Sequence, residues 1–355
     1  MIISLNFIKM IYVEVIDQMS KEIFKKPPLT QTICEIEKIF GKGSIMQMNS
    51  DKVEPIESIS TGSLGLDIAL SIGGLPRGRI VEIFGPESAG KTTLALHVIA
   101  EAQKSGGTVA FIDAENSLDI NYAKTIGVDC NKMLISQPDS GEVALNIANL
   151  LFEKNAVDLV VVDSVAALAP LAELNGDVGD SYVGIHARMM NQALRKQSHI
   201  VYKSNAILIY INQLREKVGI TFGNNEVTPG GKGLKFFTSV RLDVRKTSEL
   251  IKENDQVVGV KTNVRIVKSK VCSPYKTVSF DILYGKGISK VSEILDLAVS
   301  LNLIKKNGMW YSYNNQQIGQ GREKAREFLL KNPDLAHELE LTIRKNYNLS
   351  SNNKK

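Results

Sequence analysis

Residues 85–92 read GPESAGKT, two glycines separated by four residues and followed directly by a lysine and a hydroxyl residue. Glycines let backbone N–H groups turn toward one point, where they hold phosphate oxygens at the start of a helix. The lysine at this spacing reaches the β- and γ-phosphates of a nucleoside triphosphate, and the hydroxyl of Thr92 binds Mg²⁺. Residues 79–84 have a buried-strand pattern and residues 93–100 a helix pattern, so both flanks fit. A glycine-rich turn without a ligand is the alternative. We predict an ATP and Mg²⁺ site at Gly85, Pro86, Glu87, Ser88, Ala89, Gly90, Lys91, Thr92 and Thr93.

Two further strand patterns end in acidic residues. Residues 159–163 are four apolar residues followed by Asp163, whose carboxylate can position Mg²⁺ through its water shell. Such an aspartate alone is weak support, because many buried strands end in a helix-capping aspartate. Residues 111–115 place Glu115 just beyond another strand, where a carboxylate can polarise the attacking water. A surface glutamate that caps the next helix is the alternative for Glu115.

Three other residues could contact the nucleotide. Asp119 could accept a hydrogen bond from the exocyclic amine of the base, and Tyr122 could stack on the base. An exposed tyrosine that packs on its own helix is equally expected. Residues 207–213 are a further core-strand pattern ending in Gln213, whose amide could bond the γ-phosphate and move when that group leaves. Gln213 would then be a switch.

Two long segments, residues 175–184 and 214–231, contain glycines and have no regular period. Irregular loops near the carboxyl ends of core strands lie on the ligand side of an open α/β sheet, and long ones are usually functional or disordered. Their amides could wrap nucleic-acid phosphates, and basic and aromatic side chains could add charge and wedges between bases. Mobile surface loops are the alternative. The candidate DNA contacts are Gly176, Tyr182, Arg188, Arg195, Phe222, Gly230 and Gly231, with Lys217 and Lys232 adding charge.

The order of the patterns predicts an α/β fold. Near-continuous apolar strands alternate with helix patterns, which indicates a mostly parallel sheet covered on both faces. The strands are expected at residues 80–84, 108–113, 159–163, 206–212 and 240–244, and the helices at 92–103, 142–153 and 184–203. Later strands with little helix between them, at 239–245, 257–267 and 277–284, predict an antiparallel extension.

We expect five segments along the chain. Residues 1–18 are either a poorly ordered extension or the result of an upstream start, and residues 19–52 are a small N-terminal segment with a helix at 32–40. The ATPase core spans 53–286, a small C-terminal α/β domain spans 287–346, and a short basic tail spans 347–355. Within the C-terminal domain we expect a strand at 310–313 and helices at 322–331 and 333–344.

Composition excludes several classes of protein. With 355 residues and 43% hydrophobic content, the chain can bury more than one core, and its net charge of +5 is compatible with a polyanionic partner. Charged residues or glycine interrupt every apolar stretch, so we expect no membrane span and no secretory signal. Scattered cysteines favour a reducing, cytoplasmic location, and the histidines have no metal-site spacing. The cysteines are Cys34, Cys130 and Cys272.

Several motifs together resemble the bacterial RecA recombinase family. They are residues 61–70 (TGSLGLDIAL), 85–93 (GPESAGKTT), 111–115 (FIDAE), 161–168 (VVDSVAAL), 187–190 (ARMM), 211–213 (INQ) and 318–321 (IGQG). The similarity extends from about residue 33 to residue 344. It implies a RecA-type core and an ATP-dependent helical filament of this chain on single-stranded DNA. Such a filament pairs its strand with homologous duplex DNA, exchanges strands, and activates self-cleavage of an SOS repressor.

The resemblance also implies roles for individual residues. Lys91 and Thr92 would bind phosphate and Mg²⁺, Glu115 would be the catalytic carboxylate, and Asp163 would be the second acid beside Mg²⁺. Gln213 would couple the γ-phosphate to the second DNA loop, and the two long segments would be the DNA-binding loops. The remaining matches are Asp119 and Tyr122 at adenine, Lys268 and Lys270 at the neighbouring subunit's ATP, and Phe236 and residues 44–48 at the subunit contact.

The chain departs from the family pattern in three places. Residues 1–18 have no recognised counterpart. No acidic residue follows Glu340, whereas many members end in an acidic tail, so weaker autoinhibition of duplex capture is expected. The second loop contains Glu216 and Glu226, which leaves its individual contacts open. A ring-forming motor of the same fold, and a scaffold that ATP merely switches with a co-protease role only, are the other functions that these motifs allow.

Overall fold

The computed structural model describes residues 29–45, 56–177, 182, 184–216, 226–253, 256–314 and 316–349. The chain divides into a unit at residues 1–55 and a unit at residues 56–355. In the first unit, helix α2 (Leu29–Phe40) begins three residues before the predicted start, and none of its residues is buried. The expected extension at residues 1–18 lies outside the described residues.

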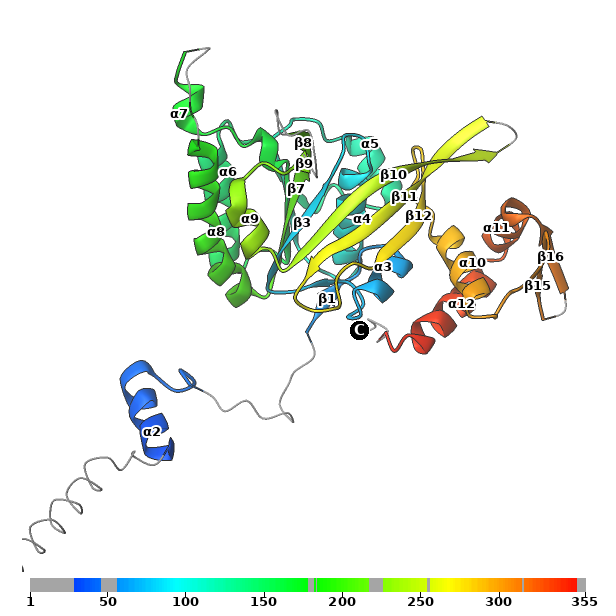
Figure 1. Cartoon of the computed structure of the whole chain (residues 1–355), viewed down its shortest axis with the longest axis horizontal. Coiled ribbons are helices and arrows are strands. Elements are labelled where there is room, and N and C mark those ends of the chain that lie inside the picture. The colour runs from blue at the N-terminus through cyan, green and yellow to red at the C-terminus, as the bar shows by residue number, and fades with distance from the viewer. Residues whose placement is uncertain are drawn as a thin grey trace, which may run out of the picture. The chain divides into compact units, whose positions relative to one another are not determined.

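A nine-stranded sheet forms the centre of the second unit (Figure 1). Its order is β13-β12-β11-β10-β3-β7-β6-β4-β5. The strands from β10 to β5 are parallel, and β11, β12 and β13 are antiparallel. This confirms the predicted α/β fold with an antiparallel extension. The strands are β3 (Arg79–Gly85), β4 (Val109–Asp113), β5 (Met133–Ser136), β6 (Leu159–Asp163), β7 (Ile207–Gln213), β10 (Val240–Glu253), β11 (Gln256–Ser269), β12 (Thr277–Leu283) and β13 (Gly287–Ile288).

Helices cover both faces of the sheet because alternate strand residues point to opposite sides. Within β3, Ile80 packs into one core, with Phe152 of α6, whereas Val81 and Ile83 pack into the other, with Leu94 of α4. The helices are α3 (Leu64–Ala69), α4 (Lys91–Lys104), α5 (Ile120–Ile126), α6 (Gly141–Glu153), α7 (Leu171–Leu174), α8 (Ile185–Ser204) and α9 (Gly231–Phe237), with a 3₁₀ turn η2 (Val165–Ala167). None of the helices within the described segments is long and apolar enough to cross a bilayer.

A third core lies in the C-terminal part of the second unit, where Leu295, Leu329 and Ile343 are buried together. The elements of this part are α10 (Lys290–Ser300), β14 (Lys305–Asn307), β15 (Trp310–Tyr313), β16 (Gln316–Gln320), α11 (Arg322–Lys331) and α12 (Pro333–Asn346). The strand at residues 310–313 and both predicted helices are present. The division of the chain at residue 287 stays a prediction.

Several elements differ from the sequence patterns. Strand β10 continues eight residues beyond the predicted end, because after Asp243 it leaves β3 and pairs with β11 alone, so polar residues are tolerated. The two strands form the long arm in Figure 1. Strand β5 and helix α5 were not predicted. β5 forms the sheet edge, with Leu134 and Ile135 about half exposed, and its four residues are too few for a recognisable pattern.

Candidate nucleotide and DNA-binding site

The glycine loop joins β3 to α4 through left-handed backbone. Ser88 has φ of 56° and Gly90, the N-cap of α4, has φ of 94°. A Cβ on Gly85 would lie 2.0 Å from the carbonyl oxygen of Val244 on β10, so a side chain cannot be accommodated there. These constraints explain the glycines, and they fix a turn whose free N–H groups open at the start of a helix. Such a turn is suited to a triphosphate.

Lys91 and Thr92 stand at the first turn of α4 with oxygen-bearing partners. The ammonium of Lys91 donates to the carbonyl of Pro86 at 2.6 Å, and burial lowers the pKa of Lys91 against the charges of Asp163, Glu115 and Glu87. The hydroxyl of Thr92 donates to Oδ2 of Asp163 at 2.7 Å. A hydroxyl beside a carboxylate is the oxygen set that Mg²⁺ prefers, so these residues fit a triphosphate-bound Mg²⁺.

Asp163 is an unusual carboxyl because it is 4% exposed. Burial, together with the nearby charges of Glu115 and Asp113, raises its pKa to about 6, although the bond from Thr92 acts to lower it. The peptide bond that follows, to Ser164, is cis. With its raised pKa, the Asp163 carboxyl changes charge at a pH of about 6.

Glu115 follows β4, and its side chain contacts residues at the ends of both the Asp163 strand and the Gln213 strand. The amide of Ala114 donates to the carbonyl of Asp163 at 2.8 Å, which attaches the end of β4 to the end of β6. Oε1 of Glu115 accepts a bond from Nε2 of Gln213 at 2.7 Å and another from Oγ of Ser164. The structure thus brings two predicted site residues into direct contact, and it adds Ser164, which the sequence patterns had not singled out.

The helix after Glu115 is capped by another residue. Oδ1 of Asp119 accepts from the amides of Asn121 at 2.8 Å and Tyr122 at 3.1 Å, so Asp119 caps α5 and Glu115 does not. The Tyr122 hydroxyl lies 3.0 Å from Oγ1 of Thr93, and burial raises the pKa of Tyr122. Tyr122 therefore joins α5 to α4, and its contact with adenine, like that of Asp119, stays a prediction.

Asn212 connects the stems of the second loop. It is fully buried, and its Nδ2 donates to Oε1 of Glu82 and to the carbonyl of Pro229, each at 3.0 Å. Its Oδ1 accepts from the amide of Gln213 at 3.0 Å. The residue before the switch candidate is therefore bonded to the far end of the loop. Asn212 belongs to the INQ motif, a signal that the sequence analysis assigned to Gln213 alone.

The loop itself begins and ends in a short two-stranded ribbon. Strand β8 (Arg215–Glu216) pairs with β9 (Glu226–Val227). Glu226 accepts from Arg245 of β10 at 3.1 and 2.5 Å, and this bond lowers the pKa of Glu226. One of the acidic residues that departs from the family pattern is thus paired within the protein. The candidates Phe222 and Lys217 lie outside the described residues.

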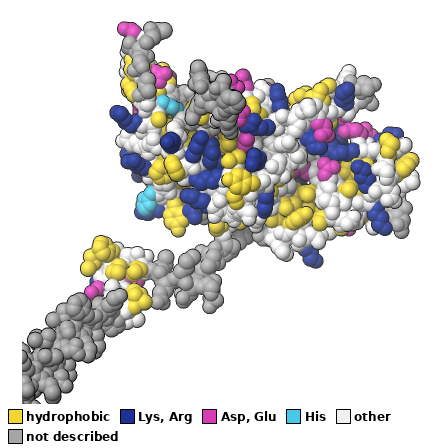
Figure 2. Space-filling model, viewed as in Figure 1, with side chains coloured by type: hydrophobic (Ala, Val, Ile, Leu, Met, Phe, Trp, Pro, Cys, Tyr) yellow, Lys and Arg dark blue, Asp and Glu magenta, His cyan; other side chains and the backbone are white. Residues whose placement is uncertain are grey.

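The other DNA candidates surround the starts of α8 and α9. Gly230 and Gly231 have φ of 90° and 74°, and a Cβ on Gly231 would lie 2.9 Å from the Cβ of Ala187, so the two helices approach closely there. Figure 2 shows Lys and Arg side chains gathered over this face. Arg188 and Arg195 are exposed on α8. A Cβ on Gly176 would lie 1.5 Å from the hydroxyl of Tyr182, so these two residues of the first loop are in contact.

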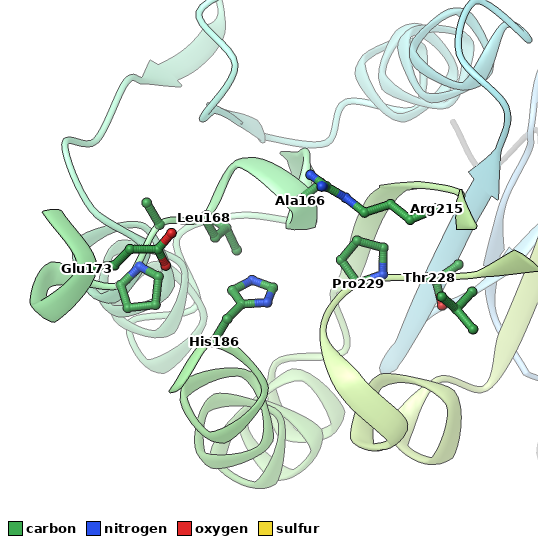
Figure 3. A pocket seen from close by; sticks show the side chains of 10 residues that line it. Ala166, Leu168, Glu173, His186, Arg215, Thr228 and Pro229 are labelled. Atoms are coloured by element: carbon green, nitrogen blue, oxygen red, sulfur yellow. The ribbon is translucent and has the colours of Figure 1, made fainter. Parts of the chain in front are cut away.

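A pocket of about 330 Å³ lies between the stems of the two loops (Figure 3). The ring of His186 lies 3.0 Å from the carbonyl oxygen of Val165, through Nε2, and burial lowers the pKa of His186. The Arg215 side chain extends toward Ala166 in Figure 3. The sequence could not group these residues, because they come from four separate segments. The lining is Ala166, Leu168, Ala169, Pro170, Glu173, His186, Arg215, Val227, Thr228 and Pro229.

Three of the candidate subunit-contact residues belong to α9 and the end of β11: Phe236 on α9, Lys268 on β11 and Lys270 just beyond it. Of the other candidates, residues 46–48 lie outside the described residues. The ammonium of Lys268 donates to the carbonyls of Lys235 at 2.7 Å and Phe236 at 3.0 Å, and burial lowers the pKa of Lys268. Lys270 is exposed, and Phe236 is 72% exposed. Lys268 is thus bonded to α9 and not to its own phosphate loop, and the proposed action on a neighbouring subunit stays a prediction.

The strand β3, a glycine loop and a helix that begins Lys-Thr are joined by β6, on the other side of β7, whose Asp163 meets that Thr. This arrangement defines a P-loop nucleoside triphosphatase. Comparisons with known proteins identify one family within this class. The sequence model of the RecA N-terminal domain matches residues 28–289, and that of the RecA C-terminal domain matches residues 292–348.

Individual relatives agree over nearly the whole chain. Protein RecA of Phytoplasma mali (strain AT) is 60% identical over 322 residues, 90% of this chain and 95% of the relative. Protein RecA of Clostridium novyi (strain NT) is 57% identical over 329 residues, 93% of this chain and 94% of the relative. Protein RecA of Acholeplasma laidlawii (strain PG-8A) is 54% identical over 326 residues, 92% and 98% of the two chains. The chain belongs to the RecA family, and it is a DNA-dependent ATPase and recombinase of DNA repair.

Proposed function

We propose that Glu115 is the general base of this ATPase, and that its activity depends on DNA through Gln213. The observation that carries this proposal is the bond between Gln213 Nε2 and Glu115 Oε1. Glu115 is thereby in contact with the last residue before the second loop. A change in that loop can therefore reach the nucleotide site through one side chain.

Phosphate binding is assigned to the loop at residues 85–93. Amides at the start of α4 would hold the phosphate oxygens, and Lys91 would exchange its bond to Pro86 for the β- and γ-phosphates. Mg²⁺ would neutralise charge that develops on the phosphates. Thr92 and Asp163 would hold it, Asp163 through a water molecule. Asp119 and Tyr122 would contact adenine at the N-terminal end of α5.

DNA binding is assigned to the faces around α8, α9 and the two loops. Arg188 and Arg195 would neutralise phosphates of single-stranded DNA, and the amides of Gly230 and Gly231 would bind others. Asn212, bonded to Pro229 and to the Gln213 amide, would transmit the position of the second loop. Gly176, Tyr182 and Phe222 complete the proposed contacts, and duplex DNA is the second substrate.

Hydrolysis is proposed to require a neighbouring copy of the chain. Lys268 and Lys270 would act on the ATP of the adjacent subunit, in the manner of an arginine finger. Phe236, exposed beside Lys268, would belong to a head-to-tail contact, which generates an open helix when the rotation does not close. The same ATP-bound filament would activate an SOS repressor for self-cleavage. Because bacterial DNA lies in the cytoplasm, the filament would act there.

Glu115→Gln tests the proposal because it keeps the shape and the bonds of the side chain while removing the base. We expect ATP affinity and single-stranded DNA affinity within about twofold of the parent, and turnover reduced at least about a hundredfold. The measurement is steady-state ATP hydrolysis with saturating DNA. A variant that hydrolyses ATP at the parent rate would refute the assignment of Glu115.

A further inference from the structure

The side chain of Ser164 lies in the nucleotide site without a role in the scheme above. It directly follows Asp163, it is fully buried, and its Oγ donates to Oε1 of Glu115. The backbone of the same segment holds Glu115 as well, because the Asp163 carbonyl accepts from the amides of Ala114 at 2.8 Å and Glu115 at 3.3 Å. Glu115 is thus attached to the end of β6 by both main chain and side chain.

The two donors to Glu115 converge on a single oxygen. Ser164 and Gln213 both donate to Oε1, and among the described residues none donates to Oε2. A carboxylate oxygen has two lone-pair sites, so two donors occupy Oε1. The remaining oxygen, Oε2, is the atom able to accept a proton from water.

The two donors differ in how freely they can leave. Gln213 is partly exposed at the base of the second loop, whereas Ser164 is 0% exposed between β6 and η2. Movement of the loop can remove Gln213 from Glu115, but Ser164 stays with the strand. Without the hydrogen bond from Ser164, the Glu115 carboxylate could rotate once its hydrogen bond with Gln213 was broken.

We propose that Ser164 is a positioning residue for ATP hydrolysis, which holds Oε1 of Glu115 so that Oε2 remains the proton acceptor after Gln213 has moved. The inference rests on the proposed role of Glu115. It predicts that Ser164 affects turnover and leaves the binding of ATP and DNA unchanged.

Ser164→Ala is the direct test. We expect kcat of the DNA-stimulated ATPase to fall about tenfold, the order expected for losing one hydrogen bond to a charged group, with KM for ATP and single-stranded DNA affinity within about twofold. Ser164→Cys keeps the size of the side chain but donates weakly, so it should also be slow. Ser292→Ala removes an equally buried hydroxyl, 1% exposed in α10, and should keep the parent rate.

A double-mutant cycle separates positioning from a general structural effect. Added to Glu115→Gln, Ser164→Ala should leave the residual single-turnover rate unchanged, because its effect passes through the Glu115 carboxylate. An equal loss in both backgrounds, or a parent-like kcat in Ser164→Ala, would overturn the proposal. A fast Glu115→Gln variant would instead overturn the role of Glu115. Should Ser164→Ala fail to fold, a parent-like kcat in Ser164→Cys overturns the proposal and a tenfold loss supports it.

Discussion

The Asp163 carboxyl has two demands placed on it by its position. In the proposed role it must be charged to hold the Mg²⁺ water shell, yet it is 4% exposed and close to two other carboxylates, Glu115 and Asp113. Burial and these neighbours raise its pKa to about 6, so the ligand-free site holds it near the point of protonation. Binding of Mg²⁺ and ATP should therefore displace a proton when the pH is low.

The affinity for Mg²⁺-ATP should depend on pH through Asp163. Because the pKa of Asp163 is raised to about 6, the carboxylate is charged above that pH and neutral below it. The affinity for Mg²⁺-ATP should therefore fall as the pH drops through about 6, by about tenfold per pH unit below it. Titration of nucleotide binding between pH 5 and pH 8 measures this change. Asp163→Asn should bind weakly at all these pH values, and an equal decline in that variant would show that another group titrates.

The side chain of His97 links α4, the helix after the glycine loop, to the edge strand β13. Nε2 of His97, on α4, accepts a hydrogen bond from the amide of Ile288 in β13 at 2.8 Å. The ring is closely enclosed, because a Cβ on Gly287 would lie 2.5 Å from Nε2 and one on Gly62 2.8 Å from the His97 Cβ. The acceptor must be unprotonated, and burial lowers the pKa of His97 to about 4.

His97 should make the fold sensitive to acid. The folded-state pKa, about 4, lies below the unfolded value of 6.5, so protonation favours the unfolded chain. The free energy of unfolding should be unaffected above pH 6.5 and fall by about 3 kcal/mol as the pH drops toward 4. Comparison with His97→Gln, which keeps an acceptor but does not titrate, isolates this group. Parallel denaturation curves for the two proteins over that range would contradict the assignment.

The sequence predicted the parts of this architecture that depend on local pattern. Buried parallel strands are apolar along their whole length, so β3, β6 and β7 were located closely, and the loop before α4 has a fixed spacing. Strand β5 was missed because it is only four residues long, too short for a recognisable pattern. The outer part of β10 was missed because its polar residues pair with β11 alone, whereas β11 itself was predicted at residues 257–267.

Sequence patterns could not predict which side chains from distant segments are in contact. Ser164 reads as an ordinary residue after Asp163, and only the folded chain brings it to Glu115. Asn212 likewise meets Pro229 across the second loop, and His97 meets Ile288 across the sheet. Sequence spacing does not encode such pairs, because the strand order of the sheet determines which strand ends become neighbours.

Assembly of several chains should be needed for turnover. Lys268 is bonded to α9, Lys270 is exposed, and Phe236 beside them is 72% exposed, which suits a contact with another copy. If Lys270 acts on the neighbouring subunit, a complete site combines Glu115 of one chain with Lys270 of the next. Each subunit would then be inactive alone.

Mixing two inactive variants tests this arrangement. Lys270→Ala and Glu115→Gln should each hydrolyse ATP slowly, whereas a one-to-one mixture should recover about a quarter of the parent rate, since random order completes about one contact in four. A mixture of Lys91→Ala with Glu115→Gln is the control and should stay inactive, because both residues belong to the same subunit's site. Equal inactivity in the two mixtures would place Lys270 outside the neighbouring site.

The most direct test of DNA-coupled hydrolysis is the rate of ATP turnover with and without single-stranded DNA over a range of protein concentrations. We predict strong stimulation by DNA, rising cooperatively with protein concentration, because in the proposed arrangement the position of the loop reaches Glu115 through Gln213 and complete sites span two subunits. A rate that is the same without DNA and simply proportional to protein concentration would contradict the account.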